Sequence, residues 1–324
     1  MATDASAATS TSTVAVSLLE YSLASGGCSS PLAATGFGVS VPSSGAGAVT
    51  LLGGGSDLGQ AAPFSGLPSL SNDGQYIVFP GYATPAGSLV GAASNLYTAN
   101  NPASESNANA ALPRASMTRV IAFVDKAGNV GVVQSAGLSA AIGTMPVHSA
   151  HYVAAGAASG FYFTCGLDNG VVVNQGGTFF LPMPSGIAGT PGAPALLIPS
   201  NAGSTAGTTA NLKMSTWISQ FQGTLYSSRM ASGSSAGVGG ITMFSNANVS
   251  SAPTSGTGGF GYSAHQFAFV TAGDGSVSLY VADGLSGLLF YPNCVITPLS
   301  CEFPRTRTRA PCARARARHA HDAR

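Results

Sequence analysis

Residues 70–82 read LSNDGQYIVFPGY, a turn followed directly by a strand. Asn72 and Asp73 favour turns because their side chains bond to nearby backbone groups, and Gly74 tolerates the positive φ of a tight hairpin. The residues after Gly74 are rich in β-branched and aromatic side chains, which is typical of strands. We therefore predict a hairpin turn that leads into a core strand.

The same pattern recurs along the chain. Gly160, Gly223 and Gly275 each precede a segment with aromatic side chains, and we expect each of these glycines to take the positive φ of a turn. Residues 124–130, 166–171 and 283–288 add strand–turn–strand hairpins. Repeated turns of this kind predict many short antiparallel strands.

Short segments with strand character fill most of the sequence, whereas helical periodicity is almost absent. The best helical window, Ser88–Leu96, is short. We predict strands at Val14–Leu19, Gly36–Val41, Ala48–Leu52, Gln75–Phe79, Arg119–Val124, Val130–Val133, Tyr152–Ala155, Phe161–Cys165, Val171–Asn174, Thr178–Leu181, Thr216–Phe221, Thr224–Ser227, Gly240–Phe244, Gln266–Val270, Ser276–Val281 and Gly287–Tyr291. The residues between Leu181 and Asn211 are predicted to be an insertion with little strand character.

Turn spacing favours a β-propeller among all-β folds. Gly74 and Gly160 are 86 residues apart, which fits two units of about 43 residues, the length of a four-stranded blade. We therefore expect an all-β fold with about five or six blades, in a ring that can end incomplete at the C-terminus. A β-sandwich or jelly roll is the alternative fold. The expected organisation is a disordered segment 1–12, a propeller-like domain 13–304 and a disordered tail 305–324.

Several stretches resemble a known family. Residues 70–82, 113–114, 119–125, 128–130 and 279–283 look like Gly/Ala-rich β-propeller proteins of bacteria and algae, which are usually secreted. The resemblance covers roughly residues 67–291. It implies the propeller fold and an extracellular setting, and it transfers no catalytic motif.

Charge divides the chain into two unlike parts. Only 7% of the residues are charged, whereas soluble domains carry about 25%. The body to residue 304 holds five basic against ten acidic residues, whereas residues 305–324 hold seven arginines and one aspartate, a net charge of +6. Such a tail is a basic arm for nucleic acid, a solvated tail without a partner, or the translation of a GC-rich simple repeat.

The cysteines and the low content of charged residues indicate where the protein is located. Five cysteines show no zinc-type spacing, and Cys294 and Cys301 are close enough to bridge a short loop in an oxidising compartment; buried free thiols are the alternative. Asn248 begins the single N-glycosylation sequon. We expect an extracellular or cell-surface protein, although no signal peptide is visible at Met1, and no segment is long and apolar enough to span a membrane.

No residues form a catalytic, cofactor or metal motif. Five aspartates at turns are candidates for a ligand-binding face, or each caps its own turn: Asp73, Asp125, Asp168, Asp274 and Asp283. His148 and His151 lack a third metal ligand, so we expect two histidines in a loop or at a strand end. Residues 233–237 match G-x-S-x-G without the flanking strand and helix of a nucleophile elbow. Trp217 is expected in the core rather than stacked on a sugar.

Three functions remain open. The first is a non-enzymatic extracellular or surface propeller that binds a protein or glycan in a shallow pocket at the ring centre. The second is a carbohydrate-active hydrolase or lyase, which requires at least two of the turn aspartates to converge on one cavity. The third is a capsid or assembly protein whose basic tail binds nucleic acid.

Overall fold

A computed structural model describes most of the predicted strands. The described residues are 2–3, 13–22, 33–52, 66–88, 117–142, 147–156, 159–165, 177–199, 214–230, 240–245, 264–283, 287–296 and 299–300. All statements about structure below refer to these residues.

These residues form strands and one short helix. In chain order they are β1 (Ala2–Thr3), β2 (Thr13–Ser22), β3 (Ala33–Ser40), β4 (Thr50–Leu52), β5 (Ser69–Leu70), β6 (Tyr76–Tyr82), β7 (Arg119–Asp125), β8 (Val130–Gln134), α1 (Ala136–Ile142), β9 (Val147–Val153), β10 (Gly160–Cys165), β11 (Gly177–Pro182), β12 (Ala195–Pro199), β13 (Met214–Phe221), β14 (Thr224–Met230), β15 (Gly240–Ser245), β16 (Ala264–Thr271), β17 (Val277–Asp283), β18 (Gly287–Tyr291), β19 (Val295–Ile296) and β20 (Leu299–Ser300). The described part contains no helix of the length and apolarity that crossing a membrane requires.

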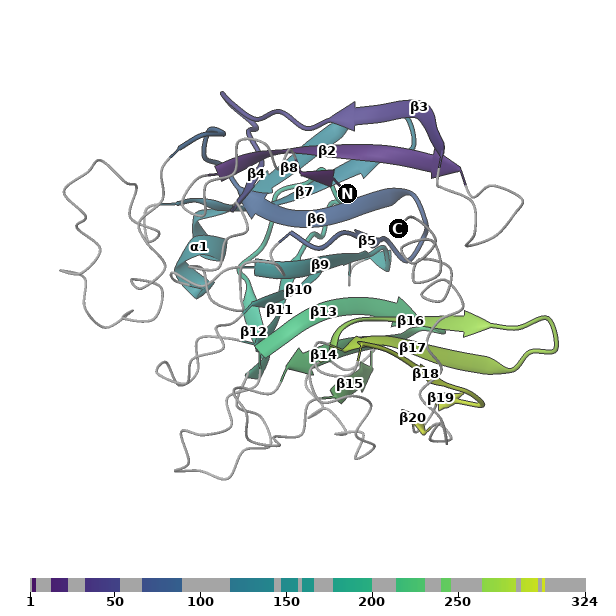
Figure 1. Cartoon of the computed structure of the whole chain (residues 1–324). Coiled ribbons are helices and arrows are strands. Elements are labelled where there is room, and N and C mark those ends of the chain that lie inside the picture. Colours follow the sequence, from purple (N-terminus) through teal and green to yellow (C-terminus); the bar gives the residue numbers. More distant parts are fainter. Residues whose placement is uncertain are drawn as a thin grey trace.

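From β6 to β18, each sheet is built from strands that follow one another in sequence. Antiparallel meanders run β6–β7–β8, β9–β10–β11–β12, β13–β14–β15 and β16–β17–β18 (Figure 1). The first strand of each meander packs against the first strand of the next: β6 against β9, β9 against β13, and β13 against β16. This is the arrangement of propeller blades, and it confirms the prediction of an all-β propeller. A sandwich or jelly roll would instead distribute the strands between two facing sheets.

The N-terminal strands do not form a separate sheet. β2 pairs with β3 and β4, and β4 pairs with β6 through Thr50 and Tyr82. The first sheet therefore continues beyond the β6–β8 meander and has eight strands.

Hydrophobic cores lie between successive sheets, and the first sheet has a further core of its own, which includes Val16, Leu51 and Phe79. Val78 and Ile121 of the first sheet pack with Phe161 and Phe163 of the second. Leu225 and Ile218 of the third sheet pack against Val153 and Tyr162 of the second, and Tyr226 packs with Leu279 of the fourth. Each sheet is therefore stabilised mainly by its neighbours, as in stacked repeats.

Six elements were not predicted from the sequence: α1, β12 and the two-residue strands β1, β5, β19 and β20, of which β1 lies in the segment 1–12 that we expected to be disordered. The two longest of the six are informative. Helix α1 was not predicted; although short, it buries Leu138 and Ile142 against the first and second sheets. Strand β12 lies in the segment that we expected to be an insertion, and it pairs with β11. In both cases tertiary packing outweighs weak local propensity. Most of the proposed helical window, residues 89–96, lies outside the described part.

Three of the four turn glycines take the expected conformation. Gly74, Gly223 and Gly275 have φ of 66°, 78° and 84°. Gly160 was predicted wrongly, because it is the first residue of β10 and the positive φ falls on Gly156 instead. A side chain at Gly160 would meet the ring of Phe180 and the backbone oxygen of Leu181, so close packing of β10 against β11 requires glycine there.

Candidate functional site

A pocket of about 620 Å³ opens where β5, β9 and β13 meet, and we call it the polar pocket. It lies between β9 and β13, the first strands of two successive meanders. The residues that line it are Pro68, Ser69, Leu70, Ser71, Asn72, His151, Trp217, Ser219, Gln220, Gln222 and Gly223. None of them carries a carboxylate.

Ser69 fixes the His151 ring. The Ser69 hydroxyl donates a hydrogen bond to the backbone oxygen of Ala150 over 2.6 Å, and its Oγ lies 3.3 Å from His151 Nδ1. A hydroxyl has one proton, and the shorter contact uses it. We therefore assign the Nδ1–H tautomer to His151, with Nδ1 donating to Ser69 Oγ. This tautomer leaves the lone pair of Nε2 as an acceptor.

Three polar atoms at the base of the pocket have no hydrogen-bond partner. They are His151 Nε2, Trp217 Nε1 and Gln220 Oε1. All three atoms are buried, and an unsatisfied buried polar group costs about 1–3 kcal/mol. The pocket therefore combines one indole donor with two acceptors, an amide oxygen and an imidazole nitrogen.

His151 is neutral at pH 7. Burial lowers its pKa from 6.5 to about 4, and the Gln220 side chain, the Leu70 backbone and the charge of Asp73 offset only part of this shift. Gln220 lies close enough to act on the ring, yet neither its Oε1 nor His151 Nε2 has hydrogen-bond geometry to a partner. The base of the pocket is therefore polar but uncharged.

A buried hydroxyl connects the two strands that carry these side chains. Ser149 Oγ of β9 accepts a 2.9 Å hydrogen bond from the backbone N–H of Ile218 on β13, and it lies 3.2 Å from Thr164 Oγ1 of β10. Ile218 stands directly after Trp217, so this contact holds β13 in place against β9. The positions of His151 and Trp217 are thereby coupled through their backbones.

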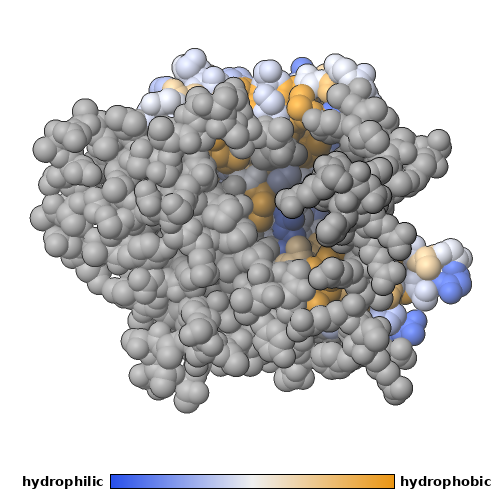
Figure 2. Space-filling model, in the orientation of Figure 1, coloured by the Kyte–Doolittle hydropathy of each residue, from blue (hydrophilic) through white to orange (hydrophobic). Residues whose placement is uncertain are grey.

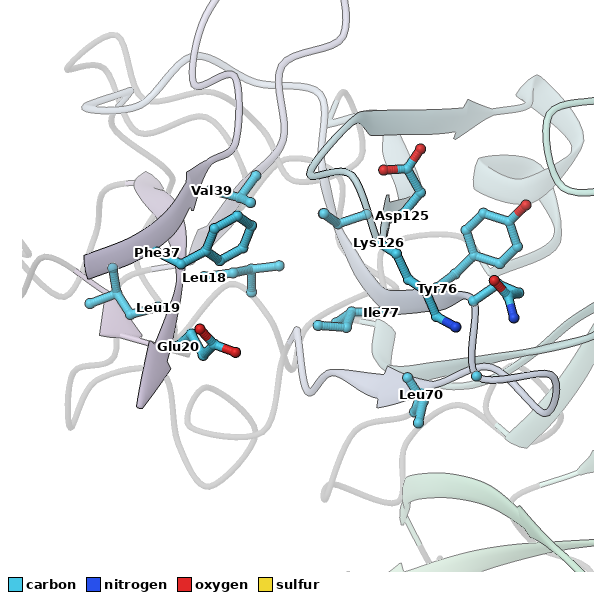
Figure 3. Close-up of a pocket in the computed structure, with 13 residues that line it drawn as sticks. Leu18, Leu19, Glu20, Phe37, Val39, Leu70, Tyr76, Ile77, Asp125 and Lys126 are labelled. Atoms are coloured by element: carbon cyan, nitrogen blue, oxygen red, sulfur yellow. The ribbon is translucent and has the colours of Figure 1, made fainter. Parts of the chain in front are cut away.

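A second, largely apolar pocket of about 460 Å³ lies between the β2–β3 hairpin and β6–β7, and we call it the apolar pocket. Figure 3 shows Leu18 and Phe37 of the β2–β3 hairpin facing Ile77 of β6 across it. The lining is completed by Leu19, Glu20, Val39, Leu70, Gly74, Gln75, Tyr76, Val124, Asp125 and Lys126.

Each described turn aspartate accepts hydrogen bonds within its own turn. Asp73 Oδ1 accepts from Ser71 Oγ at 2.6 Å, Asp125 Oδ1 accepts from the Ala127 and Asn129 N–H groups, and Asp274 Oδ1 accepts from the Ser276 N–H. These hydrogen bonds hold the pKa of Asp125 and of Asp274 below the usual value, with the Asn129 and Ser276 side chains as the largest causes. Only Asp125 lines one of the two pockets, so these three aspartates do not come together in either pocket.

Other predicted residues fall outside the described part. Asp168, Asn248 and the tail 305–324 lie there, as does the side chain of Asp283. Cys294 is disulfide-bonded, whereas Cys165 is buried and forms no disulfide. The side chain of Cys301 is not described, so its pairing with Cys294 stays a prediction. The described residues contain no group of three or more His, Cys, Asp or Glu that could hold a metal ion.

The local structure around His151, a residue of the polar pocket, was predicted wrongly from the sequence. His148 and His151 lie within β9, where all seven residues are buried, and not in a loop or at a strand end. Trp217 packs against the core between the third and fourth sheets, as expected, but it is only partly buried and also lines the polar pocket. The polar histidines made β9 look like a loop in the sequence, whereas the structure shows a fully buried strand that pairs with β10 at the edge of the second sheet.

No family model matches this sequence, and no curated protein matches it. Among solved structures, the chain is similar to the alpha-L-arabinofuranosidase PaAbf62A from Podospora anserina in complex with cellotriose, with 10% identity and a TM-score of 0.35, over 72% of this chain and 64% of that chain. The match thus spans less than two thirds of that enzyme. The catalytic domain of the Coprinopsis cinerea GH62 alpha-L-arabinofuranosidase matches with 10% identity and a TM-score of 0.37, over 74% of this chain and 71% of that chain. We transfer neither catalytic residues nor a substrate from these similarities.

Proposed function

We propose that the chain is a non-catalytic saccharide-binding propeller whose ligand occupies the polar pocket. The observation that carries this proposal is the set of unsatisfied atoms at the pocket base, His151 Nε2, Trp217 Nε1 and Gln220 Oε1. A saccharide offers many hydroxyl groups, each of which donates and accepts, and can satisfy all three atoms. These three atoms are buried, and Gln220 is only partly buried, so we expect its side chain to move when a ligand reaches them.

The chemistry of the pocket favours a neutral ligand. None of the described residues that line it has a charged side chain, and burial keeps His151 neutral at pH 7. An anionic or cationic ligand would lose hydration there without gaining an ion pair. The indole of Trp217 adds an amphipathic aromatic surface at the pocket wall.

Binding is favoured over hydrolysis by the same lining. Glycoside hydrolysis generally uses a pair of carboxyl groups on either side of the scissile bond. The polar pocket has no carboxylate in its lining, and the described aspartates are engaged in their own turns. We further propose an extracellular location, which is supported by the disulfide-bonded Cys294 and the low charge content.

An array of immobilised neutral saccharides, probed with wild-type and variant chains, tests the proposal. We expect wild type to bind a subset of saccharides and Gln220→Ala to bind them at least about tenfold more weakly. Gln266→Ala is the matched control, because Gln266 is also a partly buried glutamine, on β16, and lines neither pocket. Failure of wild type to bind any neutral saccharide, or equal binding by Gln220→Ala, would contradict the proposal.

A further inference from the structure

The apolar pocket gathers an unusual share of exposed apolar surface. Eight large hydrophobic side chains of the described residues are exposed, and four of them line this pocket: Leu19 (44%), Phe37 (54%), Leu70 (58%) and Ile77 (40%). Clustered exposed apolar side chains mark binding sites, whereas single ones are ordinary. On the face shown in Figure 2, hydrophobic and hydrophilic residues lie side by side in a central recess.

The two carboxylates at this pocket already accept hydrogen bonds, and Lys126 is the cationic side chain among its described lining residues. Glu20 accepts a 2.7 Å hydrogen bond from Thr35 Oγ1, and Asp125 accepts hydrogen bonds from the backbone of its own turn and from the Asn129 amide. A ligand therefore meets mainly aliphatic and aromatic groups there.

The two pockets adjoin through one hairpin. Residues 69–72 line the polar pocket, residues 74–77 line the apolar pocket, and Leu70 lines both. A ligand that extends from one pocket to the other crosses this hairpin at the exposed Leu70 side chain.

The dividing hairpin is firmly held. Ser71 Oγ accepts hydrogen bonds from the N–H groups of Gln75 and Tyr76 at 3.1 and 2.9 Å and donates one to Asp73. Asn72 joins the hairpin to the chain at the end of β9, donating its N–H to the Tyr152 oxygen and accepting from the Ala154 N–H. The hairpin therefore holds the two pockets at a fixed distance from each other. A ligand with two linked parts can occupy both pockets without first ordering their walls, which favours its binding.

We infer that the ligand is an amphiphilic glycoside, whose saccharide occupies the polar pocket and whose apolar aglycone crosses Leu70 into the apolar pocket. This inference rests on the proposed function, because it assigns the saccharide to the polar pocket. Volumes of about 460 and 620 Å³ are each within the range of small-molecule sites, about 300–1,000 Å³. The aglycone is an alkyl or aryl group, because the apolar pocket offers Leu18, Phe37 and Ile77 as contact surface.

Calorimetric titration with matched pairs of glycosides tests the inference. The probes are methyl and n-hexyl β-glycosides of glucose, galactose, mannose and arabinose, used below micellar concentrations. For at least one sugar, the hexyl glycoside is expected to bind about tenfold or more tightly than the methyl glycoside, because its longer chain leaves water. Ile77→Ser and Phe37→Ser should remove most of this difference and leave the methyl glycoside affinity unchanged. Leu288→Ser, at an equally exposed leucine on β18 outside both pockets, should change neither affinity.

The outcomes separate this inference from the proposed function. Equal affinity for methyl and hexyl glycosides, or a preference that survives Ile77→Ser and Phe37→Ser, overturns the amphiphilic ligand and leaves saccharide binding intact. Binding of neither glycoside overturns both proposals. Binding of n-hexanol as tightly as any hexyl glycoside overturns the assignment of a sugar to the polar pocket.

Discussion

The Ser69 side chain on β5 lies 3.3 Å from Nδ1 of His151 on β9, and the Ser69 proton is committed to the Ala150 oxygen. The two-residue strand β5 thus determines which nitrogen of the buried His151 ring on β9 carries the proton. Long-range 1H–15N correlation spectra distinguish the two tautomers of an imidazole. They should show the proton on Nδ1 at pH 7, and a proton on Nε2 would contradict the assignment.

His151 should make the fold less stable as the pH falls from about 6.5 to about 4. Burial lowers its native pKa from 6.5 to about 4, so in this window the unfolded chain binds a proton that the folded chain does not. The contribution of His151 to the free energy of unfolding is fully present above pH 6.5 and is lost as the pH falls from about 6.5 to about 4. The total loss amounts to about 3 kcal/mol. Urea unfolding at a series of pH values measures it.

His151→Gln provides the comparison for this pH dependence. The variant should unfold with a shallower pH dependence between 5 and 6.5, where few carboxyl groups titrate. The native pKa can also be read directly by NMR on the wild type, which does not require the variant to fold. A native pKa near 6.5 would show that the side chain is solvated and not buried.

Removing the Trp217 indole N–H should weaken saccharide binding. Trp217→Phe keeps an aromatic ring but deletes the donor Nε1, so affinity measured by calorimetry should fall about three- to tenfold. Tyr280→Phe is the control, because it deletes one polar group from an aromatic residue on β17 that lines neither pocket. An equal loss of saccharide affinity in Trp217→Phe and Tyr280→Phe would show that the loss does not arise in the polar pocket.

Gly160→Ala should destabilise the second sheet. The new Cβ would meet the Phe180 ring and lie 2.6 Å from the Leu181 backbone oxygen. This oxygen belongs to the β11 backbone, which cannot move aside without a cost in free energy. We expect the free energy of unfolding to fall by about 1–3 kcal/mol. Gly273→Ala, where nothing lies within 4 Å of the new Cβ, should stay within about 0.5 kcal/mol of wild type. Similar values for both variants would contradict the close packing at β10.

Cys165 should resist alkylation in the folded protein. Its thiol is buried, and burial raises its pKa to about 12, so almost no reactive thiolate forms at pH 8. Peptide-level mass spectrometry after iodoacetamide treatment should find Cys165 unlabelled in the native chain and labelled after unfolding. Rapid labelling of the native chain would mean that β10 is accessible.

A non-reducing digest should identify the partner of Cys294. Because Cys165 forms no disulfide, the partner is one of the cysteines outside the described residues, Cys28, Cys301 or Cys312. We predict Cys301, which closes the shortest loop. A linked peptide that contains Cys28 or Cys312 would contradict this pairing.

The fold could be predicted because its signals are local. The Asn72–Gly74 turn and the aromatic residues after it are visible within a few residues of sequence, and the same holds at Gly223 and Gly275. The prediction for Gly160 was wrong because the sequence does not distinguish a glycine that close packing requires from a glycine that a turn requires.

The polar pocket could not be predicted, because its residues meet only through sheet packing. Ser69, His151 and Trp217 lie on three strands that are far apart in sequence. The sequence singled out the turn aspartates instead, whose hydrogen bonds are local and structural. A polar residue on a strand that is buried only by tertiary packing carries little local signal, as His151 shows.

The most direct measurement of saccharide binding uses Trp217, the single tryptophan of the chain, as a reporter inside the polar pocket. Its fluorescence is recorded with iodide as quencher while a saccharide selected on the array is added. We predict that the emission changes saturably and that iodide quenching decreases as the saccharide covers the indole. Saccharide binding that leaves both the emission and the quenching of Trp217 unchanged would show that the ligand binds elsewhere.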